Sequence, residues 1–149
     1  MERRVKELEE LVIKQNGQLR EIQSKLELLT DRVLRLSVCK ASNGDFPFYD
    51  LILSYGITPD QQAQITRLFM ALSEKLACNA LPTRLKETES YSTDYLFSDQ
   101  PIQYDDVINS IIKIWPTTDD SLPLSLIKAM KDQGMQVHVC DYLLSKVTT

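Results

Sequence analysis

The sequence predicts an all-α protein in which a long N-terminal coiled-coil helix precedes a small multi-helix domain. Apolar residues recur at intervals of three and four over the first 36 residues. The same helical spacing returns in shorter segments further along the chain, and one of these opens with a set of residues that cap helices. We therefore expect an oligomerisation helix at residues 1–40 and a helical domain at residues 41–149.

Five consecutive heptads occupy residues 5–36. Their a and d positions are apolar with one polar exception: Val5, Leu8, Val12, Gln15, Leu19, Ile22, Leu26, Leu29, Val33 and Leu36. A period of 3.5 residues sustained over this length is typical of a helix that packs along another helix. Such a helix spans about 50 Å at ~1.5 Å per residue, which is longer than a domain of this size is wide. We therefore expect these residues to form a homo-oligomeric coiled coil.

The seam residues give mixed indications about the number of chains. Val at a with Leu at d favours two strands, whereas the layer of Leu19 and Ile22 favours more. Only Arg4 and Glu9 form an opposite-charge pair between a g position and the next e position. Further apolar residues suit either three or four strands or docking on the chain's own domain: Leu11, Ile13, Leu28 and Leu34. We prefer a trimer or tetramer over a dimer.

Gln15 is the polar exception in the predicted seam. A buried amide must find a hydrogen-bond partner across the seam, and slipped pairings of the helices deny it one. We therefore interpret Gln15 as a residue that fixes the register of the helices.

Charge is distributed unevenly along the chain. Residues 1–40 carry nine Lys and Arg against seven Asp and Glu (+2), and residues 41–149 carry eight against fourteen (−6). Binding to a phosphate backbone depends on clustered Lys and Arg. The acidic domain therefore argues against nucleic acid as a partner.

Cysteine usage and the absence of long apolar runs bear on the cellular compartment. Cys39, Cys78 and Cys140 are odd in number and widely spaced, so they fit neither a disulfide framework nor a zinc site. The start MERRVKELEE lacks the apolar segment of a signal peptide, and no run of about twenty apolar residues follows. We expect a cytoplasmic protein with reduced, mostly buried thiols and no membrane association.

The first helix of the domain follows a turn at Asn43-Gly44. Gly56 is suited to end this helix. The residues expected on its apolar face have helical spacing: Phe48, Leu51, Ile52 and Tyr55.

The next helix has the clearest start in the sequence. Thr58 can cap it, Pro59 suits its first position, and Gln61 can complete a capping box. We expect this helix to run to about Cys78. A further helix is expected at about residues 104–114, and two short helices on either side of Gly134.

Residues 79–103 mix Pro, Ser, Thr, acidic and aromatic residues without a helical period, which predicts a long loop. Loops above about 15 residues in compact domains are usually functional or disordered. Aromatic residues dominate protein interfaces and carboxylates steer a basic partner, so we expect a partner-binding site at Tyr91, Asp94, Tyr95, Phe97 and Asp99. The alternative is that the aromatic residues only pin the loop to the core.

Residues able to carry catalysis are few. His138 is the only histidine, and no signature of a nucleophile accompanies it. The adjacent pairs Asp105-Asp106 and Asp119-Asp120 could be considered for a two-carboxylate site. Adjacent side chains diverge by ~100° on a helix, however, so each pair better suits a helix cap or a solvated face. The sequence has no phosphate loop, dinucleotide fingerprint or zinc pattern. We expect a protein that is not an enzyme, with no catalytic residue, cofactor or metal site.

Residues 123–146 have the spacing of a helix-turn-helix around Ala129, Gly134 and Met135. The second helix would present to DNA the side chains of Gln136, His138, Asp141 and Tyr142. It has no Arg, and its only Lys is Lys146 at the far end. The segment is better explained as a helical hairpin that closes the core.

Several segments together point to one known family. The heptads are followed by Phe46-Pro47-Phe48-Tyr49 with Leu51, by Gly56 and by Leu72-Ser73-Glu74-Lys75-Leu76-Ala77, and later by YDDVINSII and LIKAMKDQGM. Over residues 1–78 and 104–147 the chain resembles the YhaI-like family of small Bacillus proteins. The resemblance implies an all-helical oligomer of no established activity, and it supplies no site. The chain departs from that family in its longer coiled-coil segment and in the extended segment near residues 91–103.

These features predict a non-enzymatic oligomeric protein-binding module that acts as a regulator or inhibitor of a bacterial or phage protein. The coiled coil would gather several copies, and multivalency would raise avidity without new contacts. The alternative function is a DNA-binding transcriptional regulator that uses residues 123–146.

Overall fold

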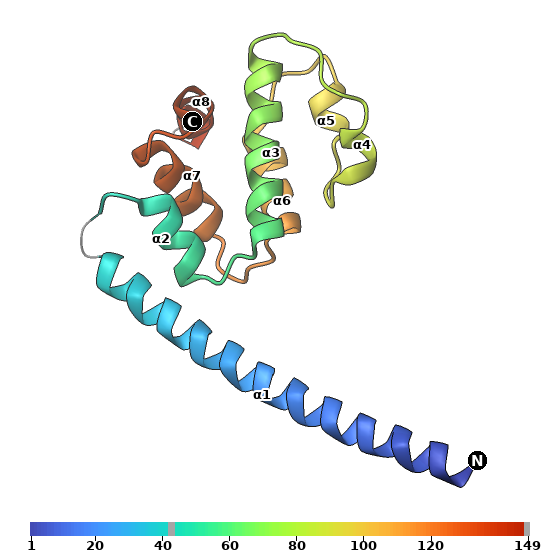
Figure 1. Cartoon of the computed structure of the whole chain (residues 1–149). Helices are drawn as coiled ribbons and strands as arrows, with labels where there is room; N and C mark the ends of the chain where they lie inside the picture. The colour runs from blue at the N-terminus through green and yellow to red at the C-terminus, as the bar shows by residue number, and fades with distance from the viewer. Residues whose placement is uncertain (42–43, 148–149) are drawn as a thin grey trace. The chain divides into compact units, whose positions relative to one another are not determined.

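The computed structural model of the chain describes residues 1–41 and 44–147, with side chains for residues 1–34, 36, 37 and 44–147 (Figure 1). Within these ranges every regular element is an α-helix, which confirms the all-α class. The chain divides into two compact units, Met1–Lys40 and Ala41–Thr149. The predicted turn residue Asn43 and the side chain of Cys39 lie outside the described residues.

Helix α1 (Glu2–Ala41) is one continuous element of 40 residues. Its length is about 60 Å at the ~1.5 Å rise of an α-helix. Ion pairs between residues one turn apart support it, Arg3 with Glu7 at 3.5 Å and Lys25 with Glu21 at 2.8 Å. Such exposed pairs add only ~0.2–0.5 kcal/mol each, so they do not compensate for the apolar surface that the helix exposes. The predicted long N-terminal helix is confirmed.

The second unit begins with α2 (Pro47–Ser54) and α3 (Pro59–Leu76). Both helices have proline in the first turn, where its missing N–H has no intrahelical partner to lose. The predicted capping box of α3 is confirmed, because the Thr58 hydroxyl accepts from the Gln61 N–H at 3.2 Å and the Gln61 side chain accepts from the Thr58 N–H at 2.9 Å.

Helix α3 is the central element of the second unit. Helices α2, α7 and α8 lie on one side of it and α4 and α5 on the other (Figure 1). It contacts α5, α6 and α8, while α7 packs on α2, α6 and α8. The later helices are α4 (Leu85–Thr88), α5 (Asp94–Phe97), α6 (Tyr104–Ile114), α7 (Leu122–Asp132) and α8 (Val137–Val147).

The structure corrects the prediction of one long loop at residues 79–103. This segment contains the one-turn helices α4 and α5, and seven of its apolar or aromatic side chains pack in or against the core: Leu81, Leu85, Tyr91, Tyr95, Leu96, Phe97 and Ile102. Each helix is only four residues long, which is too short to show a helical period in the sequence.

One apolar core joins the helices of the second unit. Its largest fully buried side chains come from α2, α3, α6, α7 and α8 at spacings of three and four: Phe48, Ile65, Leu68, Phe69, Leu72, Val107, Ile111, Leu126, Ile127, Met130, Val139 and Leu143. Burying each contributes roughly 1.5–3 kcal/mol. The second unit therefore has a core of its own, whereas α1 exposes its apolar residues.

Three helices of the second unit end in the same motif, with one residue in the left-handed region. Gly56 follows α2 with φ +62°, Gly134 follows α7 with φ +79°, and Cys78 follows α3 with φ +58°. In each case the next N–H donates to a carbonyl five residues back: Ile57 to Ile52 at 3.0 Å, Met135 to Met130 at 2.8 Å and Asn79 to Glu74 at 2.9 Å. Cys78 therefore occupies a position that favours glycine.

The two cysteines with described side chains have different surroundings. Cys140 is buried, and its burial raises the pKa of the thiol to about 11. Cys78 is exposed, which corrects the expectation of mostly buried thiols for this residue, because α3 ends before it.

The length and apolar character of the helices can be compared with those of a membrane-spanning helix. None of the described helices is both long enough and apolar enough to cross a bilayer.

Candidate functional site

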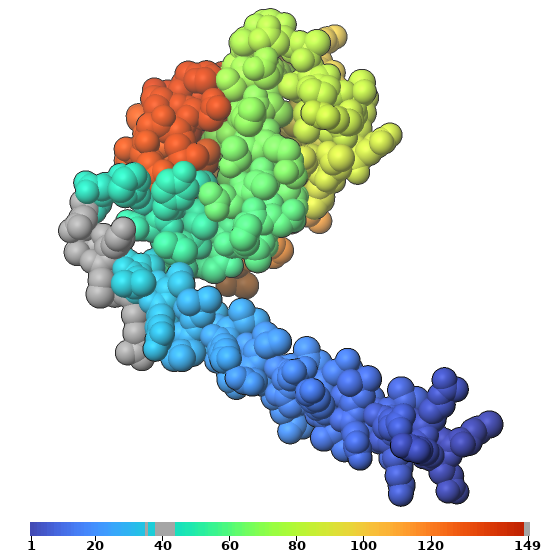
Figure 2. Space-filling view, viewed as in Figure 1, coloured from blue at the N-terminus to red at the C-terminus, as the bar shows by residue number. Residues whose placement is uncertain are grey.

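The candidate functional site is the heptad surface of α1, defined as the a and d residues from Val5 to Leu36. All nine of its apolar side chains are exposed, with exposed fractions from 38% at Val33 to 64% at Leu36. Figure 2 shows α1 as a single helix with side chains projecting along it. Monomers rarely expose apolar side chains along such a length, and this exposure makes the heptad surface the candidate interaction site.

The geometry of α1 explains why these residues form one surface. Residues three and four apart lie on the same face of a helix, so alternating steps of three and four follow one stripe along it. The stripe drifts by about 20° per heptad on a straight helix, and a left-handed supercoil removes this drift when two such helices pack together. The heptad surface therefore suits another helix with the same period.

Polar residues in and beside the heptad surface have no partner within the described part of the chain. Gln15 is exposed and makes no side-chain hydrogen bond there, and neither Arg4 nor Glu9 forms an ion pair. Neighbouring charges of α1 are already used, since Arg3 pairs with Glu7 and Lys25 with Glu21. Gln15, Arg4 and Glu9 are therefore free to contact a second helix.

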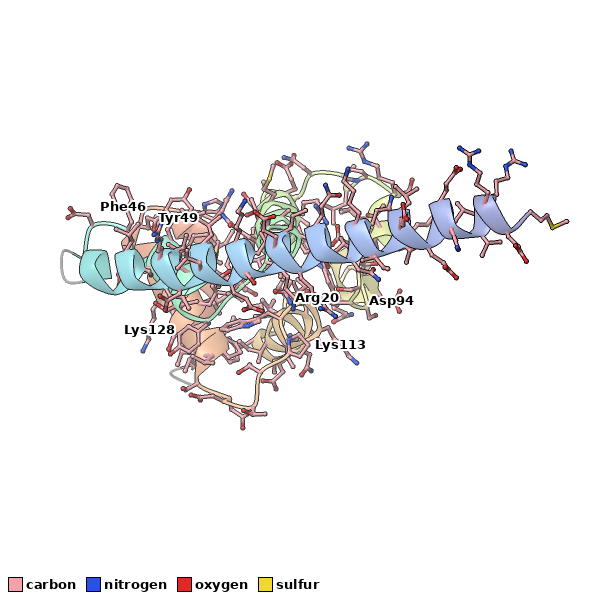
Figure 3. All side chains as sticks on the ribbon, turned by 60° about the horizontal axis from the view of Figure 1, so that its bottom comes forward. Arg20, Phe46, Tyr49, Asp94, Lys113 and Lys128 are labelled. Carbon is pink, nitrogen blue, oxygen red and sulfur yellow. The ribbon has the colours of Figure 1, made fainter. Side chains whose placement is uncertain are left out.

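The predicted partner-binding residues at 91–99 are separated by the structure. Tyr91 is only 6% exposed and belongs to the core, and Tyr95 and Phe97 are half-buried against it. Asp94 and Asp99 are exposed, and Figure 3 shows Asp94 at the surface. This corrects the expectation of an exposed aromatic surface, because the aromatic rings pack inward while the carboxylates remain in solvent.

Hydrogen bonds explain the inward position of Tyr95. Its hydroxyl lies 2.8 Å from the hydroxyl of Ser110 on α6, and Ser110 donates to the carbonyl of Asp106 at 2.9 Å. Burial raises the pKa of Tyr95 to about 12, so the phenol remains protonated at neutral pH. The Tyr91 hydroxyl, in contrast, is buried without a hydrogen-bond partner among the described residues.

Two basic residues of α3 hold the segment that carries α4 and α5. Arg67 Nε lies 2.7 Å from Glu89 Oε1, and this hydrogen bond raises the pKa of Arg67. Lys75 Nζ donates to the carbonyls of Tyr95 and, at 2.8 Å, Ser98 at the end of α5. Sequence reasoning missed both contacts because their partners lie about 20 residues away and no local pattern marks them.

Helices α7 and α8 form the predicted hairpin around Gly134. Three of the side chains that a DNA-reading α8 would present are engaged within the second unit. Asp141 pairs with Lys131 at 2.7 Å, the Tyr142 hydroxyl donates to the Ile102 carbonyl at 3.0 Å, and His138 Nε2 lies 2.7 Å from Ser73 Oγ. These contacts join α8 to α7, α3 and the segment before α6.

The pair of Ser73 and His138 is the nearest approach to catalytic geometry. A serine nucleophile needs a base within hydrogen-bond reach and a third group that orients the base. The first condition is met, but His138 Nδ1 has no hydrogen-bond partner in the described part of the chain. Among the same residues, no group of three or more His, Cys, Asp and Glu could hold a metal ion. The pair is better explained as a contact between α3 and α8.

An exposed, largely aromatic surface lies instead on one face of α2 and at the residue before it, at Phe46, Tyr49 and Leu53. Phe46 and Tyr49 have ring centroids 6.4 Å apart, and Figure 3 shows the two side chains near one another. The sequence signal was present, because Phe46, Tyr49 and Leu53 have the spacing of one helix face. The expected apolar face of this helix included Tyr55, but α2 ends at Ser54 and Tyr55 is exposed.

A pocket of about 550 Å³ lies between α3 and the segment that carries α4. Its apolar lining includes Met70, Ala71, Leu81, Pro82 and Leu85, and its polar lining consists of Arg67, Glu74, Arg84 and Thr88. Pockets of this volume accept small ligands, and here the apolar lining also suits a side chain of a protein partner.

Compared with known proteins, the chain matches no family model, no curated protein and no solved structure. The resemblance to the YhaI-like family therefore stays a prediction. Fold and site define the chain as an all-α protein with an exposed heptad helix and a separate helical unit.

Proposed function

We propose that the protein is a non-enzymatic, homo-oligomeric protein-binding module that assembles through the heptad surface of α1. The observation that carries this proposal is the exposure of all nine apolar seam residues on a continuous helix of 40 residues. Burying each would contribute roughly 1.5–3 kcal/mol. Nine such side chains in each chain give a gain comparable to or larger than the roughly 4–15 kcal/mol that association costs in translational and rotational freedom.

Three or four chains are preferred over two because α1 exposes apolar residues beyond its a and d positions. Leu11, Ile13, Leu28 and Leu34 are all exposed. A two-stranded coiled coil covers mainly the a and d residues, whereas additional strands bury a wider stripe of each helix.

The second unit would supply the partner-binding surface. Its exposed aromatic residues on α2 are of the type that dominates protein interfaces, and its net charge of −6 favours a basic partner. Several copies held by α1 would bind a multivalent partner with an avidity above that of one copy. Such a protein can act as a regulator or inhibitor of a bacterial or phage protein.

The DNA-binding alternative has less support. His138, Asp141 and Tyr142 of α8 are used in contacts within the second unit. A gel-shift assay tests it. Binding to DNA at ~100 mM salt that weakens steeply as the salt concentration is raised would favour the DNA-binding alternative.

A matched pair of substitutions tests the proposed assembly. Leu26→Asp places a charge in the seam, and Ser24→Asp places the same charge at an exposed outward f position two residues away. Light scattering should give an oligomer for the wild type and Ser24→Asp at micromolar concentration, and smaller species for Leu26→Asp. A wild-type monomer would refute the proposal, and equal loss of mass in both variants would place the interface outside the a and d residues.

The partner can be sought by capture from a bacterial lysate. The wild type, Leu26→Asp and the double variant Phe46→Ala with Tyr49→Ala should be compared. The proposal expects weaker capture of the same protein by both variants, through lost avidity in the first and lost contacts in the second. Undiminished capture by the folded double variant would move the partner surface away from α2.

A further inference from the structure

We infer that the α1 helices of different copies associate in parallel and in register, so that Gln15 of one copy meets Gln15 of the next. This inference rests on the proposed function, because it concerns the arrangement of the same helices. Two features of α1 carry it: the place of one unpaired amide in the seam and the place of two unpaired charges beside it.

The first feature is that Gln15 occupies a d position. In an antiparallel pair of helices, residues at d face residues at a of the other helix. Every a residue of α1 is Val or Leu, namely Val5, Val12, Leu19, Leu26 and Val33. No antiparallel register therefore gives the Gln15 amide a polar partner across the seam, and a buried amide without a partner is costly.

In a parallel arrangement, residues at d face residues at d. Gln15 is the only polar d residue in α1, since the others are Leu8, Ile22, Leu29 and Leu36. A shift by one heptad places Gln15 against Leu8 or Ile22, which again leaves the amide without a partner. Only the in-register parallel arrangement brings the Gln15 amides together, where each can donate to the other.

The second feature is the charge beside the seam. Antiparallel helices place g positions near g and e positions near e. The g residues from Arg4 to Arg32 include no acid, and the e residues from Glu9 to Ser37 include no base. Antiparallel pairing therefore leaves Arg4 and Glu9 without an opposite charge at these flanking positions, whereas parallel pairing places Arg4 of each copy beside Glu9 of the next.

The arrangement has a consequence for partner binding. Parallel helices bring the C-terminal ends of all α1 helices to one end of the coiled coil. Because the second unit follows α1 in the chain, the second units of all copies are then tethered to that end. A partner with several binding points would meet them together, which is the condition for avidity.

Disulfide trapping in the full chain tests the arrangement. The variants are built on Cys39→Ser with Cys78→Ser, which leaves only the buried Cys140. Parallel in-register helices place position 8 beside position 8, whereas end-aligned antiparallel helices place it beside position 33. Under mild oxidation we expect Leu8→Cys alone and Val33→Cys alone to give covalent dimers. Ser24→Cys, at an outward f position, is the matched control and should give few.

The alternative result is a covalent dimer only when Leu8→Cys and Val33→Cys chains are unfolded and refolded together. That result would overturn the parallel arrangement while leaving the proposed assembly intact. Light scattering of the reduced variants distinguishes the other failure, because a monomer would refute the assembly itself and this inference with it.

A spin label on Glu10→Cys gives a second measurement that does not alter the seam, since position 10 is an outward f position. Parallel helices keep the labels level with one another. In end-aligned antiparallel helices the labels are separated along the axis by roughly 30 Å at ~1.5 Å per residue. A distance between labels well below this separation supports the inference, and a distance above it overturns the inference. This measurement decides the arrangement even when no cysteine variant forms a cross-link.

Discussion

Arg67 on α3 and Glu89 after α4 form an ion pair, with 2.7 Å between Arg67 Nε and Glu89 Oε1, in which the Glu89 side chain is fully buried. The second guanidinium contact, from Nη2 to Oε2, is longer at 3.5 Å. A buried carboxylate depends on its partner because nothing else compensates its lost hydration. Together with the Lys75 contacts, this pair therefore ties the segment between α3 and α6 to α3.

The first prediction concerns this ion pair. Arg67→Gln should lower the free energy of unfolding by about 3 kcal/mol, at the lower end for a broken buried pair because Arg67 is itself 43% exposed. Glu89→Gln should cost less, about 1–2 kcal/mol, since it removes the charge and can keep one hydrogen bond. Urea unfolding measures both, and Arg84→Gln is the control because no ion pair holds Arg84 in the described residues. Equal small effects for all three variants would contradict a structural role for the pair.

The second prediction contrasts two tyrosine hydroxyls. Tyr95→Phe should destabilise the protein by about 1 kcal/mol, because it removes the hydrogen bond to Ser110. Tyr91→Phe should be neutral or stabilising, because the hydroxyl it removes is buried without a partner among the described residues. Thermal unfolding of the two variants checks the order. A large loss of stability in Tyr91→Phe would show that this hydroxyl has a partner, such as a buried water.

The raised pKa of Tyr95 predicts that the stability of the protein depends on pH in the alkaline range. Its pKa is raised to about 12, chiefly by burial, above the ordinary value of 10.0. The stabilisation linked to the protonated phenol is therefore fully present below pH 10 and is lost as the pH rises toward 12. The loss of stability over this range should be smaller in Tyr95→Phe than in the wild type.

The third prediction concerns the end of α3. Cys78 has φ +58° and is exposed, so Cys78→Gly relieves an unfavourable backbone conformation without loss of packing. It should stabilise the protein by roughly 1 kcal/mol, whereas Gly56→Ala at the equivalent position after α2 should destabilise it by a similar amount. Urea midpoints measure both changes. Stabilisation by Gly56→Ala would contradict the left-handed conformation.

The fourth prediction concerns Gln15. Gln15→Leu should raise the melting temperature, because in the proposed coiled coil it replaces a buried amide by an apolar side chain. It should also loosen the register or the oligomer number, because the residue that penalises other pairings is gone. Thermal unfolding and light scattering measure the two effects. A lower melting temperature with unchanged mass would place Gln15 outside the seam.

Sequence reasoning predicted best where the signal is local. The capping box of Thr58 and Gln61 links residues three positions apart, and the apolar residues of α1 repeat every three or four, so both patterns can be seen in a short window. It failed at residues 79–103, where Tyr91 and Leu96 are buried by packing against distant parts of the chain. A segment with two one-turn helices has no helical period in its sequence that could have predicted the burial of these side chains.

What the sequence by itself determined is therefore the all-α class, the long helix α1 and the residues of its apolar stripe, because helix propensity and heptad period act between near neighbours. What only the tertiary structure decided is which side chains of the second unit are available to a partner. It buries Tyr91, holds Glu89 against Arg67 and leaves Phe46 and Tyr49 exposed. The reason is that burial depends on contacts between residues 20 or more positions apart, such as Lys75 with Tyr95, and no local pattern encodes such contacts.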